Sequence, residues 1–273
     1  MIPKSIFSKL NNKMGIWYPP NSQSDISYPE DGNSICYQIE NESFWFKHRN
    51  LCILSVLNSF LPISHLFCDL GGGNGFVSKF LQQNGYTVCL IEPGTIGAQN
   101  AQKQGVKLII NSTLENLTEI NLNFPAIGMF DVLEHIEDDL VFLKQVHSSL
   151  EENGLLVFTV PAFNSLWSEN DNIAGHYRRY TLQTAENVLQ KANFSVEYKT
   201  YIFSPLYIPL FLFRSLPSRF GFINKNNVRN KTLSHHKKEN SILKKLLSSE
   251  LKDISNLRSK TIGSSCLIVA RKN

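Results

Sequence analysis

The sequence predicts an α/β fold built on a doubly wound, mostly parallel sheet of seven strands, with an insertion before the last strand. Short apolar runs alternate with segments of helical periodicity, which is the pattern of a parallel sheet with crossover helices. A glycine-rich turn at 71–75 follows the first apolar run. The chain has 273 residues and a hydrophobic content of 42%, which allows a full core and excludes a disordered protein.

Seven apolar runs have the length of buried strands. They occupy 66–70, 87–91, 106–110, 126–130, 155–160, 195–203 and 265–271. Segments with an apolar stripe at helical spacing lie between them, at 76–84, at 140–150 and after Thr181. Thr181 is the expected N-cap of the third helix, Gly85 ends the first and Gly154 stops the second.

A long segment separates the last two predicted strands. Residues 204–264, which we call the insertion, stand where a short hairpin would suffice. Loops of this length usually have a structure or function of their own. We expect the insertion to cover one side of the substrate site.

The glycine turn has the spacing Asp69-x-Gly71-x-Gly73-x-Gly75. The dinucleotide fingerprint needs Gly-x-Gly-x-x-Gly, so the pyrophosphate pattern is broken here. Glu92 follows the second strand, at the usual position of a carboxylate that accepts both ribose hydroxyls. A nucleoside without a diphosphate fits this combination better than a dinucleotide. We therefore predict S-adenosyl-L-methionine as the cofactor.

With these features the chain resembles the class I S-adenosylmethionine-dependent methyltransferases, of the bacterial type-11/type-23-like group. The stretches that carry the resemblance are 69–75, 130–136, 154–161 and 175–181. Residues 42–50 also resemble the N-terminal lid of such proteins, and 263–272 resemble their closing strand. The resemblance implies a Rossmann-like methyltransferase core at 61–203 and 265–273, preceded by a lid with helices at 1–60.

The resemblance also implies roles for individual cofactor-binding residues. Asp69, Gly71, Gly73 and Gly75 are expected near the methionine part and the ribose, and Glu92 at the ribose hydroxyls. Further contacts are expected from Pro93 against the adenine, from Thr113 and Leu114 at the adenine edge, and from Phe130 and Asp131 beside the transferable methyl group.

A polar cluster follows the fifth strand, above the carboxyl ends of the sheet, where ligands bind in this architecture. Its members are Trp167, Asp171, His176, Arg178, Arg179 and Tyr180. Two adjacent arginines are costly to bury unless they pair with acids or with a substrate anion. One reading is that one arginine pairs with Glu134 or Glu42 to fix the lid, while the other, with His176, orients the acceptor. Glu134 and His135 are read as caps of the helix that starts near Asp138.

Methyl transfer needs mainly an aligned nucleophile, because the sulfonium is already activated. For a hydroxyl acceptor, His176 is the candidate base and Asp171 its orienting partner. For a carboxylate acceptor no base is needed, and Arg178 or Arg179 would hold it bidentately. The sequence does not choose between the two, and O-methylation of a small or medium-sized acceptor is the favoured reading.

Other observations bear on location and on metals. The five cysteines, Cys36, Cys52, Cys68, Cys89 and Cys266, show no C-x-x-C pair and no zinc spacing, so we expect reduced thiols and no metal site. The sequence has no run of eighteen apolar residues, and its first residues lack the apolar core of a signal peptide. We expect a cytoplasmic protein without a transmembrane segment.

Charge is distributed unevenly along the chain. The segment from Arg214 to Lys260 carries twelve Lys or Arg and three acids. The formal net charge of the whole chain is only +4. A solvated positive face is the default interpretation. Contact with an anionic surface is the second, and the apolar residues at 205–213 suggest a lipid-linked or amphipathic acceptor. Nucleic-acid binding is the third and is not favoured, because aromatic residues are not interleaved with the lysines.

Two alternatives to a small-molecule methyltransferase stay open at this point. One is an RNA methyltransferase that uses the basic part of the insertion. The other is a catalytically silent subunit that binds the cofactor and regulates a partner. An intact glycine turn and Glu92 predict cofactor binding and do not by themselves predict turnover.

Overall fold

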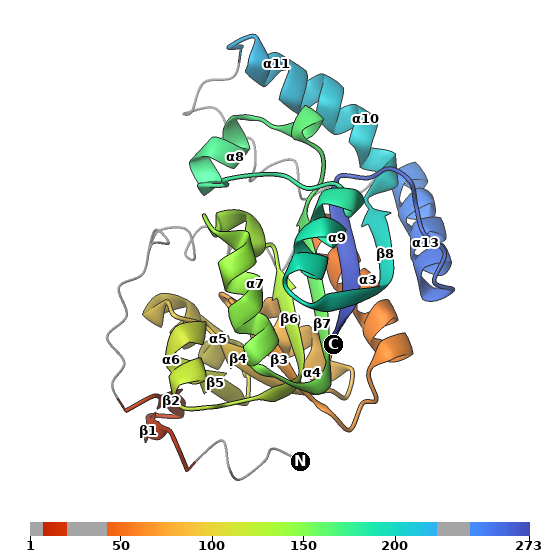
Figure 1. Ribbon diagram of the computed structural model, residues 1–273. Coiled ribbons are helices and arrows are strands. Elements are labelled where there is room, and N and C mark those ends of the chain that lie inside the picture. The colour runs from red at the N-terminus through yellow and green to blue at the C-terminus, as the bar shows by residue number, and fades with distance from the viewer. Residues whose placement is uncertain (1–7, 21–42, 223–240) are drawn as a thin grey trace.

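The computed structural model describes residues 8–20, 43–222 and 241–273. Within these ranges the centre of the molecule is one sheet with the strand order β1-β2-β5-β4-β3-β6-β7-β9-β8 (Figure 1). All seven predicted strands are present, namely β3 (Leu66–Leu70), β4 (Thr87–Ile91), β5 (Leu108–Ile110), β6 (Phe124–Phe130), β7 (Leu150–Pro161), β8 (Phe194–Ile202) and β9 (Ser265–Lys272). Pairing is parallel from β5 to β7, and β9 lies antiparallel between β7 and β8. The predicted doubly wound, mostly parallel architecture is therefore confirmed.

Two short strands extend the predicted sheet. β1 (Asn11–Lys13) and β2 (Ile16–Tyr18) form a hairpin, and β2 pairs in parallel with β5 through Trp17 and Ile110. The two residues of its turn, Met14 and Gly15, both have positive φ, as a tight hairpin turn requires. Strands of three residues are too short to show an alternating pattern, so these two strands were not predicted.

Helices cover both faces of the sheet. α3 (Phe44–Phe60), α4 (Phe76–Gln83), α5 (Thr95–Gln104) and α13 (Ser241–Ser255) cover one face, and α6 (Leu114–Glu119), α7 (Asp139–Ser148) and α9 (Leu182–Lys191) cover the other (Figure 1). Alternate residues of a strand enter the two cores, as Phe67 and Cys68 of β3 do. Thr181 caps α9 as predicted, because its side chain accepts a hydrogen bond from the backbone of Thr184.

One predicted helix end is wrong. The helix expected over 140–150 ends at Ser148, before Gly154, because Leu150 already belongs to β7 and pairs with Phe124. The start of this helix is capped by Asp138, whose carboxylate accepts a hydrogen bond from the backbone of Val141 at 3.0 Å. The interpretation of Glu134 and His135 as caps of this helix is therefore wrong.

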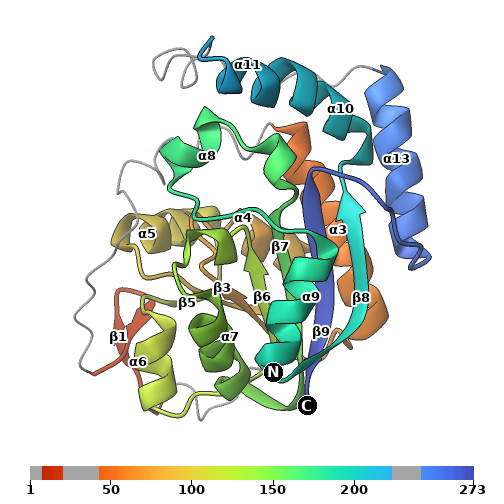
Figure 2. The same cartoon turned by 45° about the horizontal axis from the view of Figure 1, so that its top comes forward.

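Several short elements lie beyond the carboxyl ends of the parallel strands. After β7 come a 3-10 turn (Asn164–Leu166) and α8 (Glu169–Ala174). After β8 come a second 3-10 turn (Ser204–Leu206), α10 (Tyr207–Leu210), a π-helical turn (Phe211–Ser215) and α11 (Leu216–Arg219). Both views place α10 and α11 above α8, on the side of the sheet to which β8 points (Figure 2).

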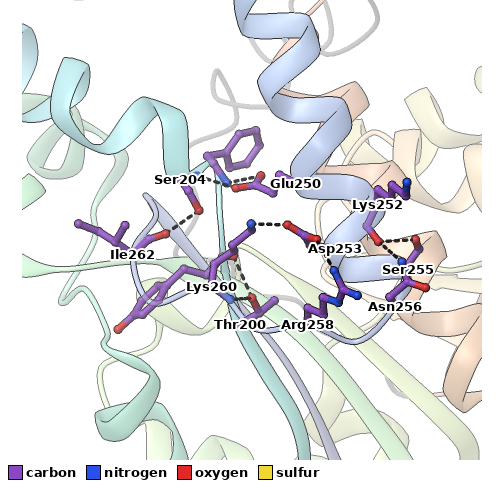
Figure 3. A network of polar contacts seen from close by, with 12 residues as sticks. Thr200, Ser204, Glu250, Lys252, Asp253, Ser255, Asn256, Arg258, Lys260 and Ile262 are labelled. Carbon is purple, nitrogen blue, oxygen red and sulfur yellow. Dashed lines mark hydrogen bonds and ion pairs between the residues drawn. The ribbon is translucent and has the colours of Figure 1, made fainter.

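The insertion is attached to the core by polar contacts of α13 (Figure 3). The carboxylate of Glu250 accepts hydrogen bonds from the backbone N–H groups of Phe203 and Ser204, at 2.8 and 2.7 Å, and lies 2.8 Å from Nε2 of His48 in α3. Within the insertion, Asp253 forms an ion pair with Lys260 at 2.5 Å. The apolar stripe of α13 packs against α3, with Leu247 and Ile254 buried.

Cys52, Cys68, Cys89 and Cys266 are free and buried, and Cys36 lies outside the described residues. Glu42 and residues 223–240 of the basic segment also lie outside them. Among the helices in the described ranges, none is both long enough and apolar enough to cross a membrane.

Candidate active site

The glycine turn joins the end of β3 to α4 with three left-handed glycines. Gly71, Gly73 and Gly75 have φ values of +69°, +52° and +79°, which L side chains rarely adopt. Space is also restricted there, because a Cβ at Gly75 would lie 2.7 Å from Cβ of Ala101. The backbone N–H of Gly71 donates to the carbonyl of Ile91 at 2.8 Å and so fixes the turn against β4.

Asp69 lies at the end of β3, beneath this turn, and is almost completely buried. Its Oδ2 accepts a hydrogen bond from Ser78 Oγ at 2.7 Å, and a Cβ at Gly72 would lie 2.7 Å from the same oxygen. Burial raises the pKa of Asp69 to about 6, although the hydrogen bond from Ser78 and the charge of Arg49 oppose the shift. Asp69 therefore supports the glycine turn from below.

Glu92 follows β4 and connects two turns. Its Oε2 accepts a hydrogen bond from the backbone N–H of Gly73, and its Oε1 accepts one from Gly94, both at 2.8 Å. Burial raises the pKa of Glu92 to about 7, with these two hydrogen bonds acting in the opposite direction. The carboxylate thus lies beside the glycine turn, where we expect the ribose of the cofactor.

Of the residues expected at the adenine, Pro93 is held by Asn111, which was not selected from the sequence. Nδ2 of Asn111 donates to the backbone carbonyls of Glu92 and Pro93, at 2.8 and 3.0 Å. Thr113 caps α6 by accepting a hydrogen bond from the backbone of Asn116, and Leu114 is buried in the core. Only the position of Asn111, directly after a strand, could have pointed to it.

Phe130 ends β6 at the same edge of the sheet, and Asp131 follows it. Asp131 has a φ of +58°, a conformation that costs about 1–3 kcal/mol in a residue other than glycine. Its carboxylate forms an ion pair with the buried Arg49 of α3 and accepts a hydrogen bond from Thr159 Oγ1 at 3.0 Å. Arg49 is a second residue that the sequence analysis missed, although it lies in the stretch that resembles the lid.

His176, Asp171 and Arg179 form one connected group at this edge. Oδ1 of Asp171 lies 2.9 Å from Nδ1 of His176 and accepts a hydrogen bond from Nε of Arg179 at 2.8 Å. Asp171 is buried, which disfavours its charge, but the hydrogen bonds from His176 and Arg179 hold its pKa well below the ordinary value. A charged Asp171 therefore fixes the orientation of the His176 ring.

Arg178 and Tyr180 face a different acid. Arg178 pairs with Asp139 at 3.1 Å and donates to the carbonyls of Ile136 and Glu137. Tyr180 is buried, and its hydroxyl donates to Asp139 at 2.8 Å. In the described residues neither arginine forms an ion pair with Glu134, so that part of the sequence interpretation is wrong: the partners are Asp171 and Asp139.

Glu134 and His135 lie in a 3-10 turn (Leu133–His135) next to His176. Glu134 is 1% exposed, and burial together with the nearby Asp131 raises its pKa well above the ordinary value. The rings of His135 and His176 meet edge to face with centroids 4.8 Å apart. Burial and the neighbouring His176 lower the pKa of His135 to about 4.

The insertion brings a cation to this group. Arg214 lies in the π-helical turn, an element that often marks functional sites, and its Nε is buried without a hydrogen-bond partner in the described part of the chain. Burial and the charge of Arg179 lower the pKa of Arg214 to about 10, while Asp171 acts in the opposite direction. The side of the site under the insertion is therefore cationic.

Comparison with known proteins identifies the class. A family model described as a methyltransferase domain matches residues 53–199, more than half of the chain, so the chain belongs to this family. A search of curated proteins finds no match.

Solved structures share the fold at low sequence identity. Phosphoethanolamine N-methyltransferase 2 of Haemonchus contortus, solved with S-adenosyl-L-methionine, is 16% identical with a TM-score of 0.55, over 94% of this chain. This chain spans 61% of the length of that enzyme. An S-adenosylmethionine-dependent methyltransferase of Thermotoga maritima is 17% identical with a TM-score of 0.54, over 88% of this chain and 99% of that one. Another from Clostridium acetobutylicum is 12% identical with a TM-score of 0.55, over 89% and 98%.

The residues present fit the cofactor of this class. The left-handed glycines leave no side chain between the backbone of the turn and a bound nucleoside. Glu92 offers a carboxylate as acceptor for ribose hydroxyls, and Asp131 adds a carboxylate near the position expected for the cationic sulfonium. These features account for S-adenosyl-L-methionine as the cofactor.

Proposed function

We propose that this methyltransferase transfers its methyl group to a hydroxyl oxygen of a small or medium-sized acceptor, and that His176 takes the hydroxyl proton. One observation carries the proposal: Nδ1 of His176 lies 2.9 Å from the buried Asp171 at the carboxyl edge of the sheet. An imidazole whose Nδ1 is held by a carboxylate keeps Nε2 available for a proton. Asp171 is then a positioning residue, and Arg179 holds Asp171 in turn.

The cofactor supplies an activated methyl group when it is bound, so the protein has to orient the acceptor and receive a proton. Asp69, Gly71, Gly73, Gly75 and Glu92 would hold the methionine part and the ribose. Pro93, Thr113 and Leu114 would line the adenine side, and Phe130 and Asp131 would lie near the methyl group.

A hydroxyl acceptor is favoured over a carboxylate because of the partners of the two arginines. Arg179 is bound to Asp171 and to the carbonyl of Ala162, and Arg178 is bound to Asp139 and to two carbonyls. Neither guanidinium therefore offers a fork for bidentate binding of a substrate carboxylate. The same contacts suggest that Arg178 and Tyr180 maintain the structure and do not touch the acceptor.

We further propose that the acceptor is amphipathic or lipid-linked. The insertion segment 208–222 exposes large apolar side chains, with Phe213 and Phe222 each 80% exposed. The segment is fixed to the loop after β7 by Ser215 Oγ, which donates to the carbonyl of Leu166 at 2.8 Å. An apolar surface of this kind next to the cationic Arg214 suits a molecule with an apolar part and an anionic part.

Acceptors that differ in one group provide the test. Aromatic rings that carry a hydroxyl, an amine or a carboxylate would be incubated with the enzyme and labelled cofactor, and the products identified by mass spectrometry. We expect methyl ethers, and a fall in kcat of about 10²–10⁴ in His176→Gln. His65→Gln, at an exposed histidine, is the control and should leave kcat unchanged.

Two results would contradict the proposal. Transfer only to nitrogen or carbon would exclude O-methylation. Binding of S-adenosylhomocysteine without turnover on any acceptor would favour the silent cofactor-binding subunit instead. Calorimetry of S-adenosylhomocysteine binding to His176→Gln separates loss of chemistry from loss of the cofactor site, because affinity should be retained.

A further inference from the structure

Three metal-ligating side chains meet next to the proposed base. One ligand atom from each of Glu134, His135 and His176 can be chosen so that all three lie within 4.8 Å of one another. Glu134 and His135 come from the 3-10 turn after β6, whereas His176 follows α8. The backbone N–H of Tyr177 donates to the carbonyl of Glu134 at 2.8 Å and fixes the two segments together.

The carboxylate of Glu134 has a buried oxygen that lacks a hydrogen-bond partner in the described residues. This oxygen is Oε2, and the side chain of Glu134 is 1% exposed. A buried carboxylate oxygen without a partner is costly, and a bound ion is one of the arrangements that satisfy such a group in native proteins. The nearby arginines do not serve this oxygen, because Arg178 and Arg179 are bound to Asp139 and Asp171.

Both histidines are already held in the manner of metal ligands. Asp171 binds Nδ1 of His176, so Nε2 is the atom left for an ion. His135 hydrogen-bonds to the backbone of Ala174, which occupies one of its ring nitrogens. Ligating histidines nearly always bind a carboxylate or a carbonyl through the second ring nitrogen, which fixes the ring and its tautomer.

We propose that Glu134, His135 and His176 bind a divalent transition-metal ion at the acceptor side of the methyltransferase site. Two imidazole nitrogens and one carboxylate oxygen suit zinc, iron, cobalt or manganese, and three protein ligands leave positions open for water or an acceptor oxygen. At metal–ligand distances of about 2.0–2.2 Å, tetrahedral ligand atoms lie about 3.4 Å apart. Side-chain rotations that shorten the longest of these separations by up to about 1.4 Å would therefore complete the site.

This inference rests on the proposed function for the identity of the acceptor, and it changes the role of His176 from base to ligand. A hydroxyl bound to the ion has a lowered pKa. Its O–H bond breaks, the electron pair stays on the oxygen, and the proton passes to water. The inference departs from the sequence expectation of no metal site, which considered the spacing of the cysteines and not histidines brought together by the fold.

Direct binding of Co²⁺ tests the proposal without an acceptor. The full chain would be treated with a chelator, dialysed and titrated with Co²⁺, and followed by visible absorption and equilibrium dialysis. We expect one ion per chain and a thermal unfolding midpoint that rises with Co²⁺. Affinity should fall at least about tenfold, equivalent to about 1.4 kcal/mol, in Glu134→Gln and in His176→Gln. His65→Gln should bind like the unchanged chain.

The variants need a folding control, and circular dichroism with S-adenosylhomocysteine affinity provides it. Absence of saturable Co²⁺ binding would overturn the metal site, as would binding that Glu134→Gln and His176→Gln leave unchanged. Failure of the proposed function looks different: the ion binds at this site, but no hydroxyl is methylated. Hydroxyl methylation that persists after chelation, without Co²⁺ binding, would overturn the metal site and keep His176 as the base.

Discussion

Oε2 of Glu92 lies 2.8 Å from the backbone nitrogen of Gly73, although 19 residues separate them in the chain. The contact joins the end of β4 to the glycine turn after β3. It holds the carboxylate beside the turn, where our proposal places the ribose hydroxyls of the cofactor. Because the carboxylate is buried there, its charge depends on pH within the range of ordinary assays.

Cofactor affinity should therefore change with pH. The pKa of Glu92 is raised to about 7, and ribose hydroxyls need the charged acceptor. Affinity for S-adenosylhomocysteine should rise with pH, by up to about tenfold per unit below pH 7, and level off above it. Calorimetry across this range measures it. The stability of the free chain should change with pH in the opposite direction. A pKa raised in the folded state means that protonated Glu92 stabilises the fold, and this contribution is lost as the pH rises through about 7.

The variant Glu92→Gln shows whether Glu92 or Asp69 causes the pH dependence of cofactor affinity. The test is needed because the pKa of Asp69, about 6, lies in the same range. The variant should bind S-adenosylhomocysteine more weakly, by about 1.5–3 kcal/mol, because it loses hydrogen bonds to a charged group. Its pH dependence should also be flatter. An unchanged slope would show that Glu92 is not the titrating group.

Two glycines with similar backbone angles should respond differently to alanine. Gly75 and Gly105 have φ values of +79° and +88°, but a Cβ at Gly75 would lie 2.7 Å from Ala101, whereas nothing lies within 4 Å of one at Gly105. Gly105→Ala should cost only the backbone strain, about 1–2 kcal/mol. Gly75→Ala should cost about 1–3 kcal/mol more, from overpacking. Urea unfolding measures both, and equal losses would contradict the close contact at Gly75.

The apolar runs of the sequence predicted the strands that form the centre of the sheet. β3 and β4 have the predicted bounds, because each is a short, mostly apolar run that a turn follows. The hairpin β1–β2 was missed because its strands have three residues each. The insertion was recognised by its length, but its attachment through His48 and Glu250 joins residues 202 positions apart.

In the candidate site, too, contacts between residues close in the sequence were predicted, and contacts between distant residues were not. Asp171 and His176 are five residues apart, and the sequence analysis already paired them as orienter and base. The partners of Arg178 and Arg179 and the meeting of Glu134 with His176 depend on how separate loops lie over the sheet. The spacing of residues within one segment does not determine such contacts.

Association with anionic lipid should depend on the exposed aromatic residues of the insertion. Replacing Phe213 and Phe222 by serine removes two side chains that are each 80% exposed, so binding should weaken at little cost to the fold. Sedimentation with anionic vesicles at low and high salt measures the effect. Val141→Ser is the matched control, because Val141 is an exposed apolar residue of α7. If the unchanged chain does not bind vesicles at any salt concentration, the membrane form of the lipid-linked acceptor is excluded.

The contact between α3 and α13 should make the attachment of the insertion sensitive to acid. Burial alone would raise the pKa of Glu250, but the hydrogen bonds from His48 and Ser204 lower it below its ordinary value. The contribution of Glu250 to stability is therefore fully present above the ordinary carboxyl pKa and is lost as pH falls through the lowered one. Glu250→Gln should lower the free energy of unfolding by about 1.5–3 kcal/mol near neutral pH, because the buried donors lose a charged acceptor.

A neighbour on the same helix provides the control for this prediction. Asp253 pairs with Lys260 at the surface, where solvent screens the charges, so Asp253→Asn should cost less than Glu250→Gln. Urea unfolding near neutral pH and in acid measures both variants, and the difference between Glu250→Gln and the unchanged chain should shrink in acid. Hydrogen exchange over α13 locates the effect, because the backbone of Phe203 and Ser204 and the ring of His48 all depend on the same carboxylate. Equal losses in the two variants would mean that the buried contact does not hold α13 to α3, and that packing of Leu247 and Ile254 alone attaches the helix.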